Sequence, residues 1–401
     1  MAFTRVKISN LYCFDDTEIN LSFSRRPINS TLDYEHLEDR ENFYFKKVCI
    51  LSGANASGKT SFGRILLGIQ IFLKEKVFED ERFRICDKNK DAYVEADFVL
   101  PQSLTLNRIS ISLFVNDSKS LCIRSFRFGQ ILIRKKESCA SATKRLNTLF
   151  SNNIAGESST HQYLTSDTFG VSSTLERFKN IFINYAWHYI FSENSEEISN
   201  FSYINKDVLS AVLKTFDNSI ATISELILKN DENTDHAVEG YSIVFKNNDK
   251  VMINLEGEIT NKDRLSRGTY EAVKISHMLS SVITDDRMVR KDGFICSSVY
   301  FLDEKMAFTH TELEKMIVTL IVSKLSKYSQ FFYTTHNYDI LNLDFPPHSF
   351  TFTKRENGVT KFIEATSICK KNDRKLQNYI KNDCFGTVPD VSRLETLLFE
   401  D

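Results

Sequence analysis

The sequence contains little of what builds flexible linkers or sulfur-based frameworks. Its 401 residues include only 5 prolines and 13 glycines, which disfavours long linkers and low-complexity tails. The 8 cysteines are scattered without a C-x-x-C pair, so they predict neither a zinc site nor a disulfide framework. The opening MAFTRVKISN has no apolar signal core, and no run of about 18 apolar residues follows it. We therefore expect a cytoplasmic protein with no membrane contact.

The chain also lacks an excess of charge of either sign. The formal net charge is -2, which excludes a uniformly basic coat for nucleic acid but leaves room for a local basic face. Hydrophobic residues make up 42% and charged residues 26%, the usual balance of a globular protein. The length suffices for one large domain or two smaller ones.

The hydrophobic pattern predicts an α/β fold. Apolar residues recur at helical spacing in the ranges 172–192, 206–228 and 313–325. Strands and hairpins are predicted at 3–23, 45–51, 93–100, 109–114, 121–128, 131–133, 241–245 with 251–255, 298–302, 330–333 and across Asn357-Gly358. We expect a mixed β-sheet core, an antiparallel N-terminal β-subdomain and a helical or mixed middle lobe, with lobes at 1–92, 93–262 and 263–401.

One glycine-rich segment has the form of a phosphate-binding loop. Residues 53–60, GANASGKT, match G-x-x-x-x-G-K-[ST], with a predicted strand before them and a predicted helix after them. Glycines let backbone N–H groups turn toward phosphates, and the following helix points its positive end at them. Lys59 would neutralise the β- and γ-phosphate oxygens of ATP, and Thr60 would give its hydroxyl to Mg²⁺. The predicted nucleotide contacts come from Gly53, Asn55, Ser57, Gly58, Lys59, Thr60 and Ser61.

A second motif places two adjacent carboxylates at the end of a buried strand. In the segment 299–304, VYFLDE, an apolar run ends in Asp303 and Glu304. Because uncompensated buried charge is costly, such a pair indicates a use for the two charges. Asp303 would hold Mg²⁺, and Glu304 would orient the attacking water and accept its proton. A solvated strand end is the simpler alternative.

Two further short segments complete the predicted site. Residues 265–271, LSRGTYE, open a helical pattern, and Ser266 with Gly268 at a helix start would form a second anion site. Since one chain already has a phosphate loop, this second element is best explained if it covers the nucleotide of a partner chain. His336, just after the predicted strand 330–333, would donate a hydrogen bond to the γ-phosphate. An ordinary N-capping serine and a structural histidine are the alternatives.

The ordered set GANASGKT, LSRGT, VYFLDE and TTHN resembles the ABC-type ATPase head shared by SMC, RecF and OLD proteins. The opening VKISNLYCF is similar to the first strand of that family, so the resemblance covers nearly the whole chain. Ser-x-Gly-Thr in place of a longer glycine signature, and the late YIKNDCFGTVPDV, resemble the stand-alone AAA15/AAA21 branch.

The resemblance implies ATP and Mg²⁺ as cofactors, ATP hydrolysis, and a homodimer or higher homo-oligomer that closes on two nucleotides. The residues that it implies to act in cis are Lys59, Thr60, Asp303, Glu304 and His336, and those in trans are Ser266 and Gly268.

This sequence departs from the family pattern in two places. After Asp303-Glu304 the family usually has a proline, a second acid and a Leu-His-Pro turn, whereas KMAFTHT keeps only His310. No glutamine can be assigned to the family's Mg²⁺ contact.

The chain also has no counterpart of two domains found in related proteins. The stretch between Thr60 and Leu265 lacks the heptads of SMC arms, and the segment after His336 is too short for the nuclease domain of OLD enzymes. We therefore expect any nuclease or toxin activity to belong to a separate chain.

The resemblance favours one function, and the residues leave alternatives open. Stand-alone ATPases of this branch often act in bacterial phage defence, as in PARIS-type systems with a TOPRIM nuclease, so by analogy this chain would be a sensor or scaffold that controls an effector. A RecF-like DNA clamp is the alternative, supported by basic residues between 108 and 145 interleaved with Phe126 and Phe128. A solvated charged face would explain the same residues. A third reading is a regulatory ATP binder with negligible turnover.

Overall fold

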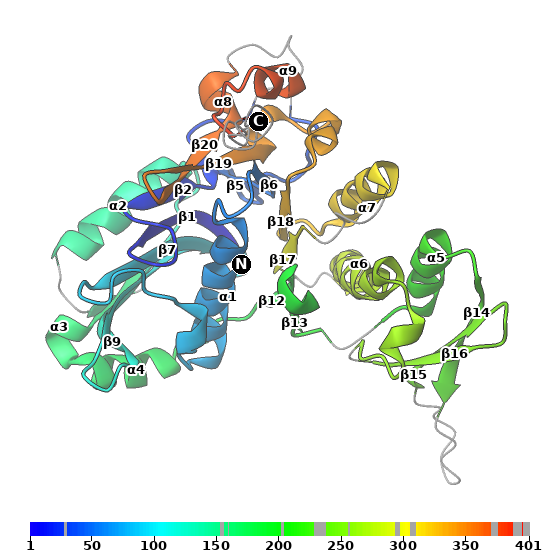
Figure 1. Cartoon of the computed structure of the whole chain (residues 1–401). Coiled ribbons are helices and arrows are strands. Elements are labelled where there is room, and N and C mark those ends of the chain that lie inside the picture. Colours follow the sequence, from blue (N-terminus) through cyan, green and yellow to red (C-terminus); the bar gives the residue numbers. More distant parts are fainter. Residues whose placement is uncertain are drawn as a thin grey trace, which may run out of the picture. The chain divides into compact units, whose positions relative to one another are not determined.

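The structure is a computed structural model, and it describes residues 1–27, 30–152, 156–158, 160–201, 204–227, 238–255, 257–292, 297–304, 310–369, 376–387 and 395. It is a mixed α/β structure with several sheets (Figure 1). The chain forms two compact units, which we call unit 1 (Met1–Asn184 with Phe332–Asp401) and unit 2 (Tyr185–Phe331). The lobe boundaries predicted at 92 and 262 remain predictions.

The largest sheet of unit 1 is antiparallel throughout. Its strands lie in the order β10-β11-β9-β8-β7-β1-β2. In chain order they are β1 (Ala2–Ser9), β2 (Thr17–Asn20), β7 (Ala92–Leu100), β8 (Thr105–Val115), β9 (Leu121–Leu132), β10 (Gly156–Ser158) and β11 (His161–Thr165). The predicted hairpin within 3–23 and the predicted antiparallel N-terminal strands are confirmed. The strands predicted at 121–128 and 131–133 are one strand, β9.

Helices cover both faces of this sheet (Figure 1). On one face lies α2 (Cys139–Asn152), and Gly129 of β9 makes room for its Phe150, because a Cβ at Gly129 would come within 2.4 Å of that ring. On the other face lie α1 (Lys59–Glu75) and α4 (Val171–Lys179).

An aromatic cluster between α1, β9 and α4 forms part of the core of unit 1. The ring of Phe126 lies 5.6 Å from that of Phe72 and 5.0 Å from that of Phe178, and Phe128 lies 5.1 Å from Phe178. All four side chains are buried. Truncating one such ring to alanine typically costs about 3–5 kcal/mol. The cluster therefore ties the helix that follows the phosphate loop to the antiparallel sheet.

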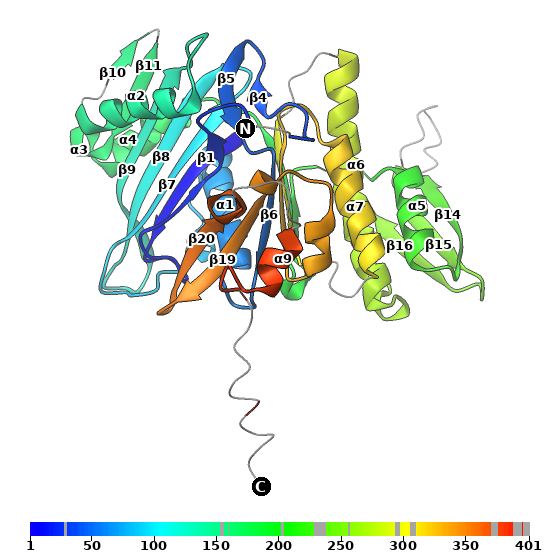
Figure 2. The same ribbon diagram turned by 90° about the horizontal axis from the view of Figure 1, so that it is seen from above.

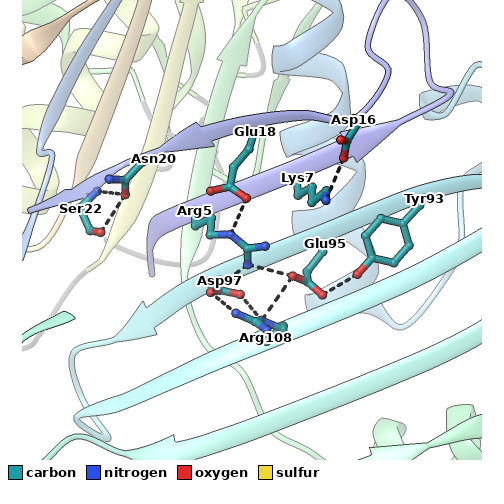
Figure 3. Close-up of polar contacts among 10 residues, drawn as sticks. All are labelled: Arg5, Lys7, Asp16, Glu18, Asn20, Ser22, Tyr93, Glu95, Asp97 and Arg108. Atoms are coloured by element: carbon teal, nitrogen blue, oxygen red, sulfur yellow. Dashed lines mark hydrogen bonds and ion pairs between the residues drawn. The ribbon is translucent and has the colours of Figure 1, made fainter. Parts of the chain in front are cut away.

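Ion pairs join neighbouring strands of this sheet (Figure 3), and the guanidinium of one of them, Arg108, lies 5.2 Å from the ring centroid of Phe150 on α2. Arg5 of β1 contacts Glu18 at 3.0 Å and Glu95 at 2.8 Å. Arg108 of β8 donates two hydrogen bonds to the carboxylate of Asp97 on β7, from Nε to Oδ1 at 2.5 Å and from Nη2 to Oδ2 at 2.7 Å. Both partners of this last pair are buried. Arg5 also lies 3.4 Å from Asp97, and Glu95 lies 3.6 Å from Arg108, so the four charges form one network in which each charge has an opposite neighbour. These cations therefore serve the packing of the sheet.

Three further strands of unit 1 surround the phosphate loop. β6 (Val48–Gly53) pairs in parallel with β19 (Phe350–Glu356), which pairs antiparallel with β20 (Val359–Glu364). Asn357 and Gly358 have φ values of 50° and 83°, which suits the tight turn of the predicted hairpin. The strand before the loop and this hairpin are confirmed.

Short elements complete unit 1. They are β3 (Ser22–Phe23), β4 (His36–Leu37), β5 (Arg40–Phe45), η1 (Asp80–Arg82), α3 (Ser166–Phe169), η4 (Tyr338–Asn342), η5 (Pro347–Ser349), α8 (Ala365–Ile368) and α9 (Leu376–Lys381). Strands β3, β5 and β4 pair in that order as a small antiparallel sheet. Among the described residues of the whole chain, no helix is both long and apolar enough to cross a membrane.

The described part of unit 2 contains two groups of strands and the α-helices α5, α6 and α7. β12 pairs in parallel with β17 and antiparallel with β13, and helix α6 packs against β12. Helix α5 lies between α6 and the sheet β14-β15-β16 (Figure 2). The bounds are β12 (Ala186–Ile190), η2 (Glu193–Ser195), β13 (Glu197–Ser199), α5 (Lys206–Phe216), β14 (Ile220–Ile227), β15 (Val238–Phe245), β16 (Lys250–Asn254), η3 (Lys262–Arg264), α6 (Arg267–Asp292), β17 (Ser298–Asp303) and α7 (Thr311–Lys324). Strand β18 (Gln330–Thr335) carries the chain back into unit 1.

Two predicted helices are wrong in their second halves. The helix predicted at 172–192 ends at Lys179, and 186–190 form β12. The helix predicted at 206–228 ends at Phe216, and 220–227 form β14, while Leu228 lies outside the described residues. Asp217 accepts a hydrogen bond from the backbone N–H of Ser219, which makes the turn before β14, and the β-branched residues of β14 favour a strand. Their spacing matched a helix by coincidence.

Candidate functional site

The predicted phosphate loop connects β6 to α1 in unit 1. Strand β6 is buried along its whole length and ends at Gly53, and α1 begins at Lys59. Between them Gly58 has a φ of +94°, a left-handed conformation that a side chain makes costly. A Cβ on Gly58 would also lie only 2.6 Å from the Cys13 Sγ atom. The strand, loop and helix that the motif requires are therefore present, and its second glycine is required by the backbone.

Two threonines of the neighbouring hairpin hold the loop in place. The Oγ of Ser57 lies 2.7 Å from Oγ1 of Thr353 on β19, and Oγ1 of Thr360 on β20 donates to the Ser57 carbonyl at 2.9 Å. A Cβ on Gly53 would come within 2.3 Å of that Thr353 hydroxyl. The sequence analysis missed both threonines, because nothing local links them to a loop some three hundred positions earlier. The loop is thus supported from the side opposite its open face.

The charges at the loop suit an anion. The Lys59 side chain is buried, and its ammonium donates to the carbonyls of Gly53 at 2.7 Å and Ala54 at 3.0 Å, which holds it over the loop. Among the described residues no side chain caps the start of α1, and the first turn contains no acid. Thr60 and Ser61 lie half-buried in that turn, and Asn55 is exposed on the loop. Helix N–H groups and one ammonium therefore form a positive cradle, which fits a phosphate group.

The predicted carboxylates lie at the end of β17 in unit 2. Asp303 is fully buried, and its Oδ2 atom accepts hydrogen bonds from the Ser192 hydroxyl at 2.8 Å and from the Ser192 backbone N–H at 3.3 Å. Glu304 is half-buried and has a φ of +46°, a strained backbone for a residue with a side chain, and such strain clusters at functional sites. The sequence analysis missed Ser192 because it placed that residue in a helix.

The segment that follows Glu304 is described only from His310 onward. His310 precedes α7, and its Nδ1 atom accepts from the backbone N–H of Glu312 at 3.3 Å, so this histidine caps the helix. Residues 305–309 lie outside the described ranges.

The predicted partner-facing element also lies in unit 2. Ser266 is exposed just before α6, and its Oγ atom accepts from the backbone N–H of Thr269 at 3.1 Å, the geometry of an N-cap. A Cβ on Gly268 would meet one described atom, Ser266 Oγ, at 3.9 Å. Within the described chain, packing therefore does not require a glycine at 268, although glycine in a helix costs about 1 kcal/mol relative to alanine. The N-cap alternative and an exposed anion site are both compatible with this geometry.

His336 follows directly after β18 and is exposed in unit 1. The backbone N–H of Asn337 donates to Thr335 Oγ1 at 3.0 Å, and the Asn337 side chain caps η4, so the turn that presents the histidine is well defined. Unit 1 thus contains the phosphate loop and His336, and unit 2 contains Asp303, Glu304, Ser266 and Gly268.

The basic segment differs from its predicted role as a nucleic-acid surface. Phe126 and Phe128 are fully buried in the aromatic core, so these two rings do not contribute to the surface that the DNA-clamp alternative requires. Arg108 is buried against Asp97, and Arg124 contacts Asp91 at 2.6 Å. The acids that neutralise these cations come from outside the segment, which is why counting charges within the segment overstated its basicity. The cations that stay exposed are Lys119, Arg124, Arg134, Lys135, Lys136 and Lys144.

No family model matches this sequence, and no curated protein matches it. Among solved structures the chain is similar to an SMC head, which was crystallised bound to the C-winged helix domain of ScpA. The identity is 14% and the TM-score is 0.45, and the match covers 90% of this chain and 98% of the other. A likeness at this level assigns neither a family nor an activity to the chain.

Proposed function

We propose that this chain binds and hydrolyses Mg·ATP as an ABC-type ATPase, and that two copies close on two nucleotides. The observation that carries the proposal is the loop at 53–60, in which a buried strand, a left-handed glycine, a buried lysine and an uncapped helix start coincide. Each of these features is needed to hold a polyphosphate, and the combination has no evident use in packing alone.

In this proposal the loop supplies the charge and the N–H groups for the phosphates. Lys59 leaves the Gly53 and Ala54 carbonyls and pairs with β- and γ-phosphate oxygens, and Thr60 gives its hydroxyl to Mg²⁺. Asp303 supplies the carboxylate for the same ion. Bound Mg²⁺ neutralises charge on the phosphate oxygens. Ser192 keeps the Asp303 carboxylate oriented through its 2.8 Å hydrogen bond.

Hydrolysis requires a group that activates water. Glu304 directly follows Asp303, and its carboxylate would orient a water molecule and accept its proton. His336, exposed at the end of β18, would donate a hydrogen bond to the γ-phosphate.

The dimer is proposed from the start of α6. Ser266 is exposed, and Gly268 has no described packing neighbour that would exclude a side chain. A glycine that costs helix stability without a packing reason suggests that another molecule approaches its backbone closely. We propose that this molecule is the nucleotide held by the phosphate loop of a second copy.

The cellular role is proposed from the motif resemblance alone. In it the ATPase is an antiviral sensor or scaffold that holds a separate effector, a nuclease or a toxin, and releases or activates it. Purification together with the product of the adjacent gene tests this role. An ATPase that always purifies alone, in cells that gain no protection from phage, would contradict it.

The ATPase itself is tested by phosphate release from the purified chain with Mg·ATP. Wild type is expected to turn over, and Lys59→Ala is expected to lose nucleotide binding by about 100-fold or more, because a buried charge partner of the phosphates is removed. Lys74→Ala, on the same helix but at its far end, is the matched control and should behave as wild type. Nucleotide binding without any phosphate release would leave only the regulatory-binder reading.

A further inference from the structure

A cluster of two histidines and one glutamate lies inside unit 2, outside the predicted nucleotide site. His188 comes from β12, Glu197 from β13 and His277 from α6. His188 Nε2 and His277 Nδ1 each lie 2.7 Å from the same oxygen, Oε1 of Glu197. The three ligand-type atoms lie within 4.8 Å of one another, and all three side chains are almost fully buried.

We propose that His188, Glu197 and His277 form a binding site for a divalent transition-metal ion, with Zn²⁺ the ion that this donor set fits best. Two imidazoles and one carboxylate are the protein ligands of a common kind of open zinc site, with bonds of about 2.0–2.2 Å. Ligand atoms around such an ion stand about 3.3 Å apart in tetrahedral geometry. The two 2.7 Å contacts therefore need to open only slightly to admit the ion.

The proton inventory of His188 favours a cation in this place. Ser281 Oγ donates to the His277 carbonyl at 3.1 Å and also lies 3.1 Å from His188 Nδ1. With the hydroxyl proton on that carbonyl, Nδ1 is the N–H donor to Ser281. The lone pair of a neutral His188 ring is then on Nε2 and faces the carboxylate oxygen.

The contacts around the cluster match those that support metal ligands elsewhere. The bond from His188 Nδ1 to Ser281 fixes the ring and its tautomer, as partners of metal-bound histidines usually do. Glu197 keeps its second oxygen for Lys274, whose ammonium lies 3.3 Å from Oε2. The oxygen facing the histidines therefore stays available for the ion while the carboxylate remains held.

A pocket beside the cluster provides an entry path for the ion. Glu197 and His277 line an open pocket of about 810 Å³, together with Asn200, Tyr270 and Lys274. Gly257 also lines the pocket with a φ of +80°, and a Cβ there would lie 3.8 Å from Glu197 Oε2. Because Gly257 has no side chain, the chain passes close to the cluster and leaves room for water or a small ligand on the ion. The ion would link helix α6, which Ser266 caps, to strand β12, which pairs with β17.

The test measures zinc binding by the full chain without nucleotide and without a histidine tag. Thiols are blocked first, because Cys86 and Cys384 are exposed and would also bind zinc. After chelator treatment and equilibrium dialysis, wild type is expected to bind about one Zn²⁺ per chain and to unfold at a higher temperature with zinc than without. Wild type that binds less than about a tenth of an equivalent would overturn the proposal.

Variants locate the site. Glu197→Gln and His277→Gln are expected to weaken zinc binding by at least about 10–100-fold and to lose the thermal shift. The matched control is His348→Gln, which removes another buried histidine, paired with Glu35 at 2.9 Å but without a second histidine, and zinc binding should be unchanged. Folded Glu197→Gln that binds zinc as tightly as wild type would also contradict the proposal. Lys59→Ala should bind zinc normally, so failure of the metal site and failure of the ATPase proposal are distinguishable.

Discussion

We propose a phosphate contact at two helix starts, those of α1 and α6, and the two are built in different ways. The start of α1 in unit 1 is held by groups from β19 and β20 and by the lysine that follows the loop. The start of α6 in unit 2 is capped by Ser266 of its own chain, and Ser266 is exposed. The first is supported on one side and open on the other, as a ligand cradle must be. The second combines an exposed Ser266 with a Gly268 that the described packing does not require, and we propose that another molecule covers it.

This difference explains why the two elements are expected to respond differently to mutation. Changes at the α1 loop should act within one chain and affect nucleotide affinity. Changes at the α6 start should leave affinity nearly intact and affect association of two chains. Changes at Glu304 should leave nucleotide affinity nearly intact and affect turnover.

The largest expected effect separates binding from turnover. Glu304→Gln removes the proposed proton acceptor while keeping the shape of the side chain, so phosphate release should slow by about 10²–10⁴-fold with ATP binding retained. Phosphate release and nucleotide titration measure the two effects. The matched control is Glu312→Gln at the start of α7, an exposed acid paired with Lys315, which should turn over normally. Unchanged turnover in Glu304→Gln would remove that residue from the mechanism.

The next effect tests the phosphate loop at the start of α1. Gly58→Ala forces a side chain into a backbone with φ +94° and to within 2.6 Å of Cys13 Sγ, so ATP affinity should fall by about 100-fold or more. Gly170→Ala has a similar strain at φ +73° but open space around its Cβ, and it should bind ATP normally. Titration with a fluorescent ATP analogue checks both variants. Equal affinities for the two would mean that the loop geometry does not matter for binding.

A third variant tests the exposed start of α6. Ser266→Asp preserves the cap of α6, because aspartate caps helices as well as serine, but it places a negative charge where we propose a partner's phosphate. ATP-dependent association should weaken by about 10–100-fold with nucleotide affinity unchanged. Asn205→Asp makes a similar change at the N-cap of α5 in the same unit, and it should associate normally. If Ser266→Asp associates as wild type does, Ser266 is only a cap.

The smallest effect concerns the support of Asp303. Ser192→Ala removes the 2.8 Å hydrogen bond to its carboxylate, so the Mg²⁺ concentration needed for half-maximal turnover should rise about tenfold. Ser199→Ala on β13 removes a hydroxyl that bonds the Trp187 carbonyl instead, and it should leave the Mg²⁺ requirement unchanged. A titration of turnover against Mg²⁺ distinguishes the two, and equal requirements would exclude Ser192 from the site.

Local patterns in the sequence predicted the elements that carry the loop. The β6 strand, the glycine loop and α1 follow one another in the chain, and each has its own signal, so no distant partner was needed to identify them. The β1–β2 hairpin and the Asn357-Gly358 turn were predictable for the same reason. The helix boundaries near Lys179 and Phe216 were not, because a few β-branched residues happened to recur at helical spacing.

Contacts between distant residues were beyond sequence reasoning. Phe126 and Phe128 alternate with basic residues, and only the position of α1 and α4 shows that the rings face the core. Thr353 and Thr360 reach the loop from the far end of the chain, and Ser192 reaches Asp303 from the segment just after β12, which was predicted as helix. The His188–Glu197–His277 cluster combines residues from three elements, and their spacing in the sequence matches no metal-binding motif. In each case the deciding interaction joins segments with no shared local motif.

The most direct test of the account is the mass of Glu304→Gln in solution with and without saturating Mg·ATP, measured by light scattering. If two copies complete each nucleotide site, the hydrolysis-impaired protein should be monomeric without nucleotide and double its mass with it. The double variant Glu304→Gln with Ser266→Asp should bind ATP but keep the monomer mass. A Glu304→Gln protein that binds Mg·ATP and stays monomeric would contradict the proposed closure of two chains on the nucleotide.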